Sequence, residues 1–277
     1  MQIKYKLLEK MKNLTSTEMN FLIYIAKIQN LKGKIYGVHH KDVCDHTGMC
    51  KQSFYTSMWG LEKKGLIVIE RCSGIDYDIT IQDNDFSYKE AWKEGYVNLH
   101  RKIFHQKRFL HLKAKEKYML MYFLKITHEN SSSYRIGIAT FYAKFCKELH
   151  VTARVVRSYL HSLRAFFSVR IKDGKYFITY RSNVFRDSIP DRIESWYPKA
   201  FVSAIARRFK LRDVTQKQIE DTAYFFKQYK QIAQEQNLDI FQLIEEAVRR
   251  VALEEEKPKK RKLNPKYVHV KIREILF

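Results

Sequence analysis

The pattern of hydrophobic and polar positions in the first third of the chain predicts a helix followed by a short strand. Residues 14–18 combine Ser and Thr with a following Glu, which is typical of a helix start. The apolar positions that then share one helical face are Phe21, Leu22, Ile25 and Ile28. A turn containing Asn30 and Gly33 leads into an extended piece over residues 34–38, which predicts a small strand.

Two further helices separated by a glycine are predicted next. A short helix over residues 41–47 stops at Gly48, which suits a left-handed turn, and a longer helix runs from Cys50 to Gly65. The positions of the longer helix that point inward are Phe54, Met58 and Leu61. The residues left to point outward at its N-terminal end are Lys51, Gln52, Ser53, Tyr55 and Thr56. This is the helix-turn-helix arrangement, in which such residues contact base edges in the major groove of DNA.

Two β-rich runs after the longer helix, over residues 66–71 and 77–81, predict a hairpin. Their turn contains Ser73 and Gly74, and the alternating positions expected to form one buried face are Tyr77, Ile79 and Ile81. A hairpin beside a helix-turn-helix forms a wing, and Arg71 on this wing is a candidate DNA contact.

The same pattern occurs a second time along the chain. At an offset of 98 positions, six residues of the first copy recur as Leu112, Glu116, Tyr122, Lys125, Ile126 and Tyr134. Further along the offset is 102, and three more residues recur as Cys146, Leu163 and Ile171. The second copy therefore carries four extra residues, which are expected in a loop. This duplication predicts two modules in one chain.

The second copy predicts three helices, over residues 113–128, 141–149 and 152–167. Phe167 stands where the first copy has Gly65. The outward positions at the start of the third helix are Thr152, Arg154, Arg157, Ser158 and His161. Asp173 and Gly174 between two β-rich runs indicate a two-residue hairpin. The hairpin cations within reach of phosphates or a minor groove are Arg170, Lys172, Lys175 and Arg181.

Helical periodicity continues after a polar linker over residues 181–190. Helices are predicted over residues 198–209, 215–236 and 239–256, with an apolar stripe formed by Ile219, Ala223, Phe226, Tyr229 and Ile232. The stripe is either the core of a helical subdomain packed on the second module, which we favour slightly, or an interface that pairs two chains. A basic run over residues 257–262 follows, and the alternation over 267–272 predicts a short strand.

Residues 62–67 read Glu-Lys-Lys-Gly-Leu-Ile and directly follow the longer helix of the first copy. This junction resembles the one found in many winged-helix DNA-binding domains of bacterial regulators and replication initiators, and the resemblance covers residues 14–81. With the duplication, it implies a mainly α fold with small β-wings. The expected domains are two tandem winged-helix domains, over residues 1–85 and 98–181, and a helical C-terminal region over residues 190–277.

The net charge of +22 is unevenly distributed along the chain. Residues 86–181 hold 20 Lys and Arg against 6 Asp and Glu, whereas residues 1–85 hold 12 against 10. Such an excess favours a polyanionic partner, because neutralising phosphates releases condensed counterions. The alternative is a solvated basic face. Since Arg can pair with guanine and Gln with adenine, the best candidates for base contacts are Arg154, Arg157 and Gln52.

Other chemistry finds little support in the sequence. Four cysteines are too few for a disulfide scaffold and are expected to be small buried side chains. The His- and Cys-containing segment 39–50 has no paired C-x-x-C motif, so we expect no metal and no cofactor. A phosphate-binding loop, a His-x-His motif and an acidic cluster in the basic module are lacking. A tyrosine nucleophile would need convergent Arg and His groups. We therefore expect no enzyme and no catalytic residue.

The expected function is sequence-specific binding of double-stranded DNA by a transcriptional regulator, with two modules on one long site. The alternative is a plasmid or phage replication initiator that binds repeated origin sequences, and a third reading is an architectural or segregation protein. Expected partners besides DNA are the transcription or replication machinery and a second copy bound through the C-terminal helices. No apolar run or signal peptide indicates a membrane, so a cytoplasmic, nucleoid-associated location is expected.

Overall fold

The computed structural model describes residues 1–71, 75–99, 103–104, 106–129, 133–181, 196–254 and 261–277. Within these ranges the chain is mainly helical with three small sheets, which confirms the predicted fold class at that level. Its contacts group into two compact units: residues 1–34, 43–68 and 80–191 form the first, and residues 35–42, 69–79 and 192–277 form the second. Nearly all of the predicted linker and most of the predicted basic run lie outside the described residues.

The first copy consists of a helix, a strand, two helices and two strands, in that order. These are α2 (Ser16–Ile28), β2 (Lys34–His39), α3 (His40–Thr47), α4 (Lys51–Lys63), β3 (Ile67–Arg71) and β4 (Asp76–Ile81). Thr15 caps α2, because its hydroxyl accepts from the backbone N–H of Glu18 at 3.3 Å and the Glu18 carboxylate accepts from the Thr15 N–H at 2.8 Å. Gly48 and Gly65 adopt φ of +72° and +67°, so the predicted left-handed turn after α3 is confirmed.

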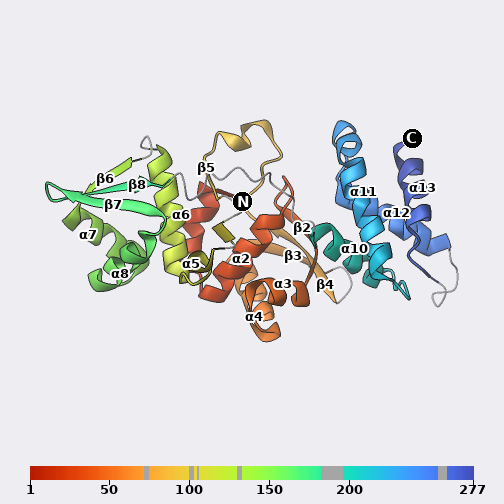
Figure 1. Cartoon of the computed structure of the whole chain (residues 1–277), viewed down its shortest axis with the longest axis horizontal. Helices are drawn as coiled ribbons and strands as arrows, with labels where there is room; N and C mark the ends of the chain where they lie inside the picture. Colours follow the sequence, from red (N-terminus) through yellow and green to blue (C-terminus); the bar gives the residue numbers. More distant parts are fainter. Residues whose placement is uncertain (72–74, 100–102, 105, 130–132, 182–195, 255–260) are drawn as a thin grey trace. The chain divides into compact units, whose positions relative to one another are not determined.

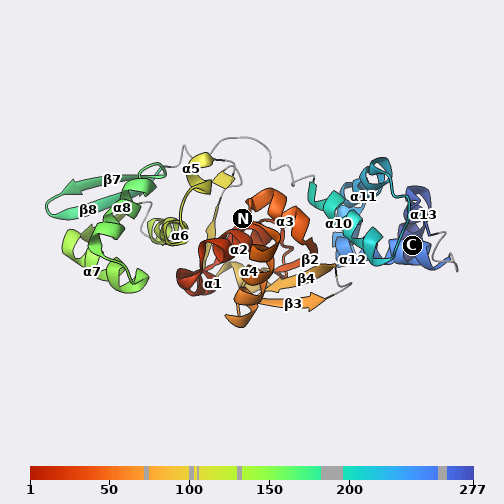
Figure 2. The same ribbon diagram turned by 90° about the horizontal axis from the view of Figure 1, so that it is seen from below.

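The second copy has the same element order. Its elements are α6 (Ala114–Glu129), β6 (Ser133–Gly137), α7 (Ile138–Leu149), α8 (Ala153–Leu163), β7 (Phe167–Lys172) and β8 (Lys175–Tyr180). Both sheets place their last strand in the middle, in the orders β2-β4-β3 and β6-β8-β7. In both ribbon views α7 and α8 lie on one side of the second sheet (Figures 1 and 2). Glu116 repeats the role of Glu18, since its carboxylate accepts from the Lys113 N–H at 2.7 Å.

The four extra residues of the second copy lie in a helix, so the prediction of a loop is wrong. Helix α3 has 8 residues and α7 has 12. Four residues are close to one turn of 3.6, so the insertion lengthens the helix while keeping the same face toward the core. The third helix is also shorter than predicted. It ends at Leu163, because Phe166 and Phe167 are buried and Phe167 already begins β7.

The two copies are in contact within the first unit, where α1 (Tyr5–Lys10) and α2 pack on α6. Lys117 of α6 is buried and donates to Asn20 Oδ1 at 2.7 Å, with its ammonium 5.3 Å from the centre of the Phe109 ring. Burial lowers the pKa of Lys117 to about 8. This ammonium therefore lies at a point of contact between the two copies.

The remaining short elements of the first unit join the N-terminus to the segment between the copies. Strand β1 (Gln2–Lys4) pairs antiparallel with β5 (Tyr96–Asn98), so that Ile3 lies opposite Val97. The Lys4 ammonium forms an ion pair with Glu94 at 2.9 Å. The single-turn elements are η1 (Met11–Asn13), η2 (Lys89–Trp92) and α5 (Lys107–Leu110).

Four helices follow in the second unit: α10 (Trp196–Arg208), α11 (Gln216–Glu235), α12 (Ile240–Glu254) and α13 (Pro265–Leu276). Their core contains Phe201, Ile244 and Tyr229, and it also contains Tyr36 of β2. The predicted stripe on α11 lies in or against this core, so it is a core stripe. These helices pack on strands of the first copy, which belong to the same compact unit. The sequence had favoured packing on the second module, so that prediction is wrong.

Helix α13 replaces the short strand predicted over residues 267–272. Asn264 caps it by accepting from the Lys266 N–H at 3.1 Å, and Pro265 occupies its first turn. The buried residues of α13 are Val268, Ile272 and Leu276, which are spaced four apart. The alternation seen in the sequence was therefore part of a helical pattern that extends beyond the segment.

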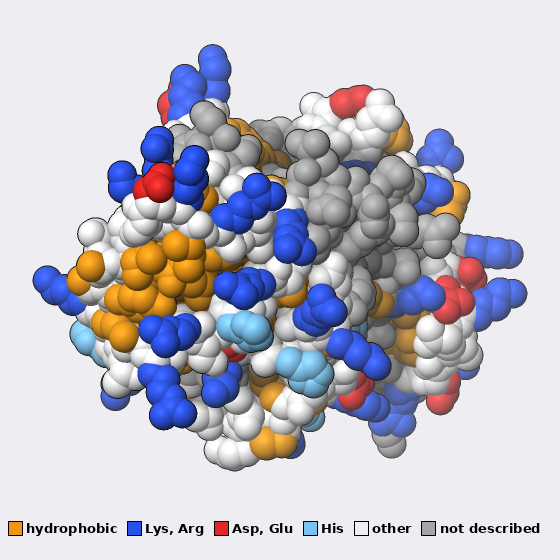
Figure 3. Space-filling view, turned by 60° about the vertical axis from the view of Figure 1, so that its left-hand side comes forward, with side chains coloured by type: hydrophobic (Ala, Val, Ile, Leu, Met, Phe, Trp, Pro, Cys, Tyr) orange, Lys and Arg blue, Asp and Glu red, His pale blue; other side chains and the backbone are white. Residues whose placement is uncertain are grey.

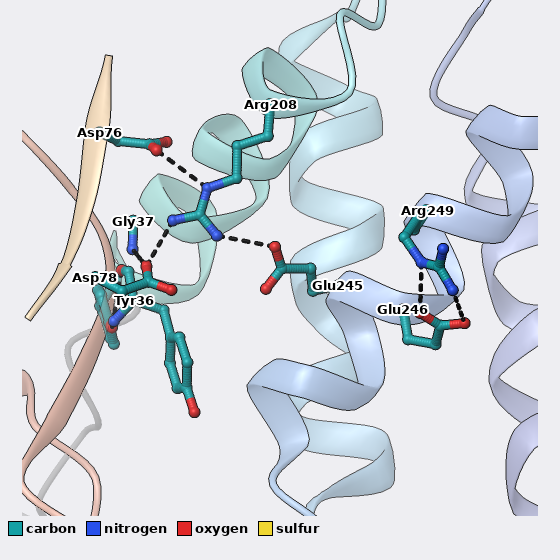
Figure 4. Close-up of polar contacts among 9 residues, drawn as sticks. Tyr36, Gly37, Asp76, Asp78, Arg208, Glu245, Glu246 and Arg249 are labelled. Atoms are coloured by element: carbon teal, nitrogen blue, oxygen red, sulfur yellow. Dashed lines mark hydrogen bonds and ion pairs between the residues drawn. The ribbon is translucent and has the colours of Figure 1, made fainter. Parts of the chain in front are cut away.

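The two strands of the predicted hairpin, β3 and β4, are neighbours in the sheet, and the face of Tyr77, Ile79 and Ile81 is buried as predicted. The opposite face of β4, expected to be open, is buried as well. Asp76 and Asp78 of β4 alternate with apolar residues and are only 0% and 6% exposed. Their partner is Arg208 of α10, whose Nε lies 3.0 Å from Asp76 and whose Nη2 lies 2.6 Å from Asp78 (Figure 4). Nη1 donates to Glu245 at 2.8 Å. Burial opposes the charge of Arg208, but these carboxylates outweigh burial and raise its pKa.

Candidate nucleic-acid interface

Helix α4 presents the predicted residues of the first copy at its N-terminal end. Cys50 occupies the N-cap position, and the inward residues Phe54, Met58 and Leu61 are fully buried. Of the outward set, Lys51, Gln52 and Thr56 are exposed, whereas Ser53 and Tyr55 are half-buried. The first turn contains no acidic residue, so the positive end of the helix dipole faces solvent without a neighbouring carboxylate on the helix.

Helix α8 of the second copy has a more cationic start. Thr152 is its N-cap residue, and the buried positions are Val156, Tyr159, Leu160 and Leu163. All five predicted outward residues are exposed: Thr152, Arg154, Arg157, Ser158 and His161. The first turn again lacks acidic residues. An anion approaching this end would meet backbone N–H groups and two guanidinium groups together.

The two arginines of α8 are held differently. Arg157 Nε donates to the hydroxyl of Tyr142 on α7 at 3.4 Å, and its guanidinium lies 5.8 Å from the centre of that ring. The Tyr142 hydroxyl lies 3.0 Å from that of Tyr176 on β8, and burial raises the pKa of Tyr176 to about 12. Arg154 has no hydrogen-bond or ion-pair partner among the described residues. Arg157 is therefore oriented by its own module before any ligand binds, and Arg154 is not.

The hairpin of the second copy is formed as predicted. Lys172 pairs with Lys175 across the turn, where Asp173 and Gly174 have φ of 48° and 66°. The predicted hairpin cations, all exposed, are Arg170, Lys172, Lys175 and Arg181. Figure 3 turns the side carrying this copy forward and shows many Lys and Arg side chains on it with few Asp and Glu. In the first copy, Arg71 ends β3 and its side chain lies outside the described residues.

The cysteines do not behave as predicted. Cys50 is exposed, and Cys44 and Cys146 are half-buried, so none of these three is a fully buried side chain. Cys50 occupies the N-cap position of α4 without a side-chain hydrogen bond to the helix backbone, and its Sγ lies 3.2 Å from the Ser53 hydroxyl. Hydrogen bonds from Ser53 lower the pKa of Cys50. Cys72 lies outside the described residues.

Sequence reasoning missed the tyrosines that orient Arg157. Tyr142 directly follows the buried Phe141 and lies off the buried face of α7, so its spacing carries no sign of a contact with α8. The contact arises only when α7 and α8 pack together. An offset of 102 pairs Tyr142 with His40 of the first copy, so comparison of the copies does not reveal it either.

No family model, curated protein or solved structure matches this chain. The described residues contain no group of three or more His, Cys, Asp and Glu side chains placed to hold a metal ion. Among the described helices, none has both the length and the apolar character needed to span a bilayer.

Proposed function

We propose that the chain binds double-stranded DNA sequence-specifically through two winged-helix modules and acts as a transcriptional regulator. The proposal rests on an arrangement of helices and strands that occurs in both copies. Each copy has the order helix, strand, helix, helix, hairpin, and each exposes the carboxylate-free start of its third helix. In winged and other helix-turn-helix proteins that helix lies in the major groove.

The second copy is proposed as the main reader. It has Arg154 and Arg157 on its third helix where the first copy has Gln52 and Tyr55. A guanidinium can donate two hydrogen bonds to guanine O6 and N7. The exposed hairpin cations would then bind phosphates beside the groove, which positions the helix without reading sequence. DNA as the partner places the protein in the cytoplasm with the nucleoid.

Selection of bound fragments from a random duplex library tests the proposal. The full chain should enrich a long motif with two separated parts, one for each module, and binding should weaken steeply as salt concentration rises. Failure to retain any duplex at low salt would contradict DNA binding itself. Enrichment without a sequence motif would contradict the regulator and favour an architectural protein.

Mapping occupancy in cells distinguishes regulation from replication initiation. A regulator should occupy promoter regions. Occupancy confined to one array of repeats next to the protein's own gene would contradict the regulator and favour a replication initiator. Both functions would use the same chemistry at DNA, so the pattern of occupancy is what separates them.

A further inference from the structure

The second copy contains a surface cavity of about 490 Å³, and of its lining residues only His161 and Arg181 belong to the proposed DNA contacts. Its wall is formed by the end of α5 and the following turn, the start of α6, the end of α8 and the residue after β8. The charged and titratable side chains that line it are Arg108, His111, Glu116, His161, Arg164 and Arg181. All of them belong to the first compact unit.

The cavity is strongly cationic. Three guanidinium groups, those of Arg108, Arg164 and Arg181, line it, and none has a side-chain hydrogen bond or ion pair within the described part of the chain. The single carboxylate, Glu116, is 6% exposed and already accepts the helix-capping hydrogen bond from the Lys113 N–H. Exposed guanidinium groups that line one cavity without internal partners are suited to binding an oxyanion, because their planar donors match its geometry.

In the first copy the equivalent carboxylate, that of Glu18, is paired with a cation of its own module. Lys64 Nζ lies 2.6 Å and 2.8 Å from the two oxygens of Glu18. A Cβ on Gly60 would lie only 2.5 Å from a Glu18 oxygen, so the glycine makes room for this carboxylate. Glu18 is thus neutralised within the molecule, and the ion pair lowers its pKa although burial opposes this.

The second copy keeps the carboxylate as Glu116 but lacks the residues that surround Glu18 in the first. At an offset of 102, Phe166 stands in place of Lys64, Ser162 in place of Gly60 and Arg164 in place of Glu62. The Phe166 ring is buried in the core and supplies no charge to Glu116. The carboxylate of Glu18 is therefore paired with a lysine in the first copy, whereas the equivalent Glu116 lines a cavity with three arginines in the second.

We propose that this cavity binds the phosphate group of a small phosphorylated ligand, with Arg108, Arg164 and Arg181 as its donors. The volume falls in the range of about 300–1,000 Å³ that is typical of small-molecule sites. The free oxygen of Glu116 accepts a hydrogen bond from a hydroxyl or amino group of the ligand, which favours a phosphomonoester over a bare anion. His161 lines the cavity and also belongs to the outward set of α8, so the ligand lies beside the proposed DNA contacts.

Calorimetric titration of the full chain with inorganic phosphate and then with adenosine monophosphate tests the proposal. Arg164→Glu restores the first-copy residue and should weaken binding roughly tenfold or more, since it removes a charge-assisted donor and adds a repelling carboxylate. Lys147→Glu makes the same charge change on an exposed residue of α7 outside the cavity and should leave affinity within about twofold. Arg108→Ala serves as the second cavity variant if Arg164→Glu does not fold.

Absence of saturable binding, or equal weakening by the cavity variants and Lys147→Glu, would overturn the proposal. Repeating the titration with the chain saturated by duplex DNA distinguishes the source of the phosphate. Retained binding supports a separate small ligand, whereas loss of binding assigns the cavity to a DNA backbone phosphate and overturns the small-ligand proposal. The first titration requires no DNA, so its outcome is independent of the proposed function.

Discussion

The sheets of the two copies have the same strand order and different surroundings. Sheet β2-β4-β3 buries Asp76 and Asp78 against Arg208, and its Tyr36 lies in the core of the C-terminal helices. In sheet β6-β8-β7 the equivalent Tyr134 is only half-buried, and the hairpin cations are exposed. The first sheet thus packs against the C-terminal helices, whereas the second sheet, with the same strand order, has a cationic hairpin that is exposed to solvent. Substitutions should accordingly affect stability in the first sheet and ligand binding in the second.

Replacing Arg208 should have the largest effect on stability. Arg208→Met leaves two buried carboxylates without their cation, so the free energy of unfolding should fall by about 3–5 kcal/mol. Denaturant unfolding measures it. The matched control is Arg249→Met, which breaks an exposed pair with Glu246 and should cost less than about 1 kcal/mol. Similar losses in the two variants would mean that the first sheet is not anchored by this network.

Lys117 should destabilise the contact between the copies, where the first copy has the buried Met19 at the equivalent position. Its pKa is lowered from 10.5 to about 8, so between these values the unfolded chain holds a proton that the folded chain has lost. The free energy of unfolding should therefore rise with pH through that window. Lys117→Met should remove this rise and add on the order of 2–3 kcal/mol at pH 7.

Urea unfolding of the wild-type chain and Lys117→Met across pH 7 to 11 measures both effects. Other groups titrate in the same range, so the difference between the two proteins is the relevant quantity. A difference that stays constant with pH would contradict the role assigned to the buried ammonium.

Removing the hydroxyl that orients Arg157 should have a moderate effect on DNA binding. Tyr142→Phe removes the hydroxyl that accepts from Arg157 Nε and that also lies 3.0 Å from the Tyr176 hydroxyl. Loss of the contact with Arg157 should weaken specific DNA binding by about 1 kcal/mol, or roughly fivefold. Tyr134→Phe removes a hydroxyl from the same copy without touching Arg157 and serves as the control. Equal affinity of Tyr142→Phe and the wild-type chain would show that Arg157 is not preorganised by α7.

The smallest expected effect concerns the hairpin of the second copy. Lys172→Ala should weaken binding to specific and random duplexes alike, because a phosphate contact reads no sequence. The slope of log affinity against log salt concentration should become shallower by about 0.9 for the one lost contact. An unchanged slope would exclude Lys172 from the phosphate contacts.

Most of the repeated architecture could be predicted from the sequence because its signals are local. Capping by Thr15 and Glu18, the glycines after α3 and α4, and the Asp173-Gly174 turn depend on residues close together along the chain. Exposure of the whole outward set on α8, and of Lys51, Gln52 and Thr56 on α4, followed from helical spacing alone. These elements required no knowledge of tertiary contacts.

The incorrect predictions concern features that depend on contacts between residues far apart in the sequence. Asp76 and Asp78 are buried because Arg208, some 130 residues away, neutralises them. The segment around Val268 alternates over six residues, but its burial against α11 and α12 requires the helical spacing. The cavity beside Glu116 is lined by residues of α5, α6 and α8 and by Arg181, which are far apart in the sequence and come together only in the fold.

The second copy is proposed to be the main reader of duplex DNA. Competition binding with a selected duplex compares Arg154→Ala/Arg157→Ala with Lys51→Ala/Gln52→Ala in the full chain. We predict that the first pair lowers specific affinity by at least about tenfold more than the second, since two guanidinium groups each contribute about 1–3 kcal/mol of base discrimination. Equal losses in the two double variants, or a larger loss for Lys51→Ala/Gln52→Ala, would contradict the account.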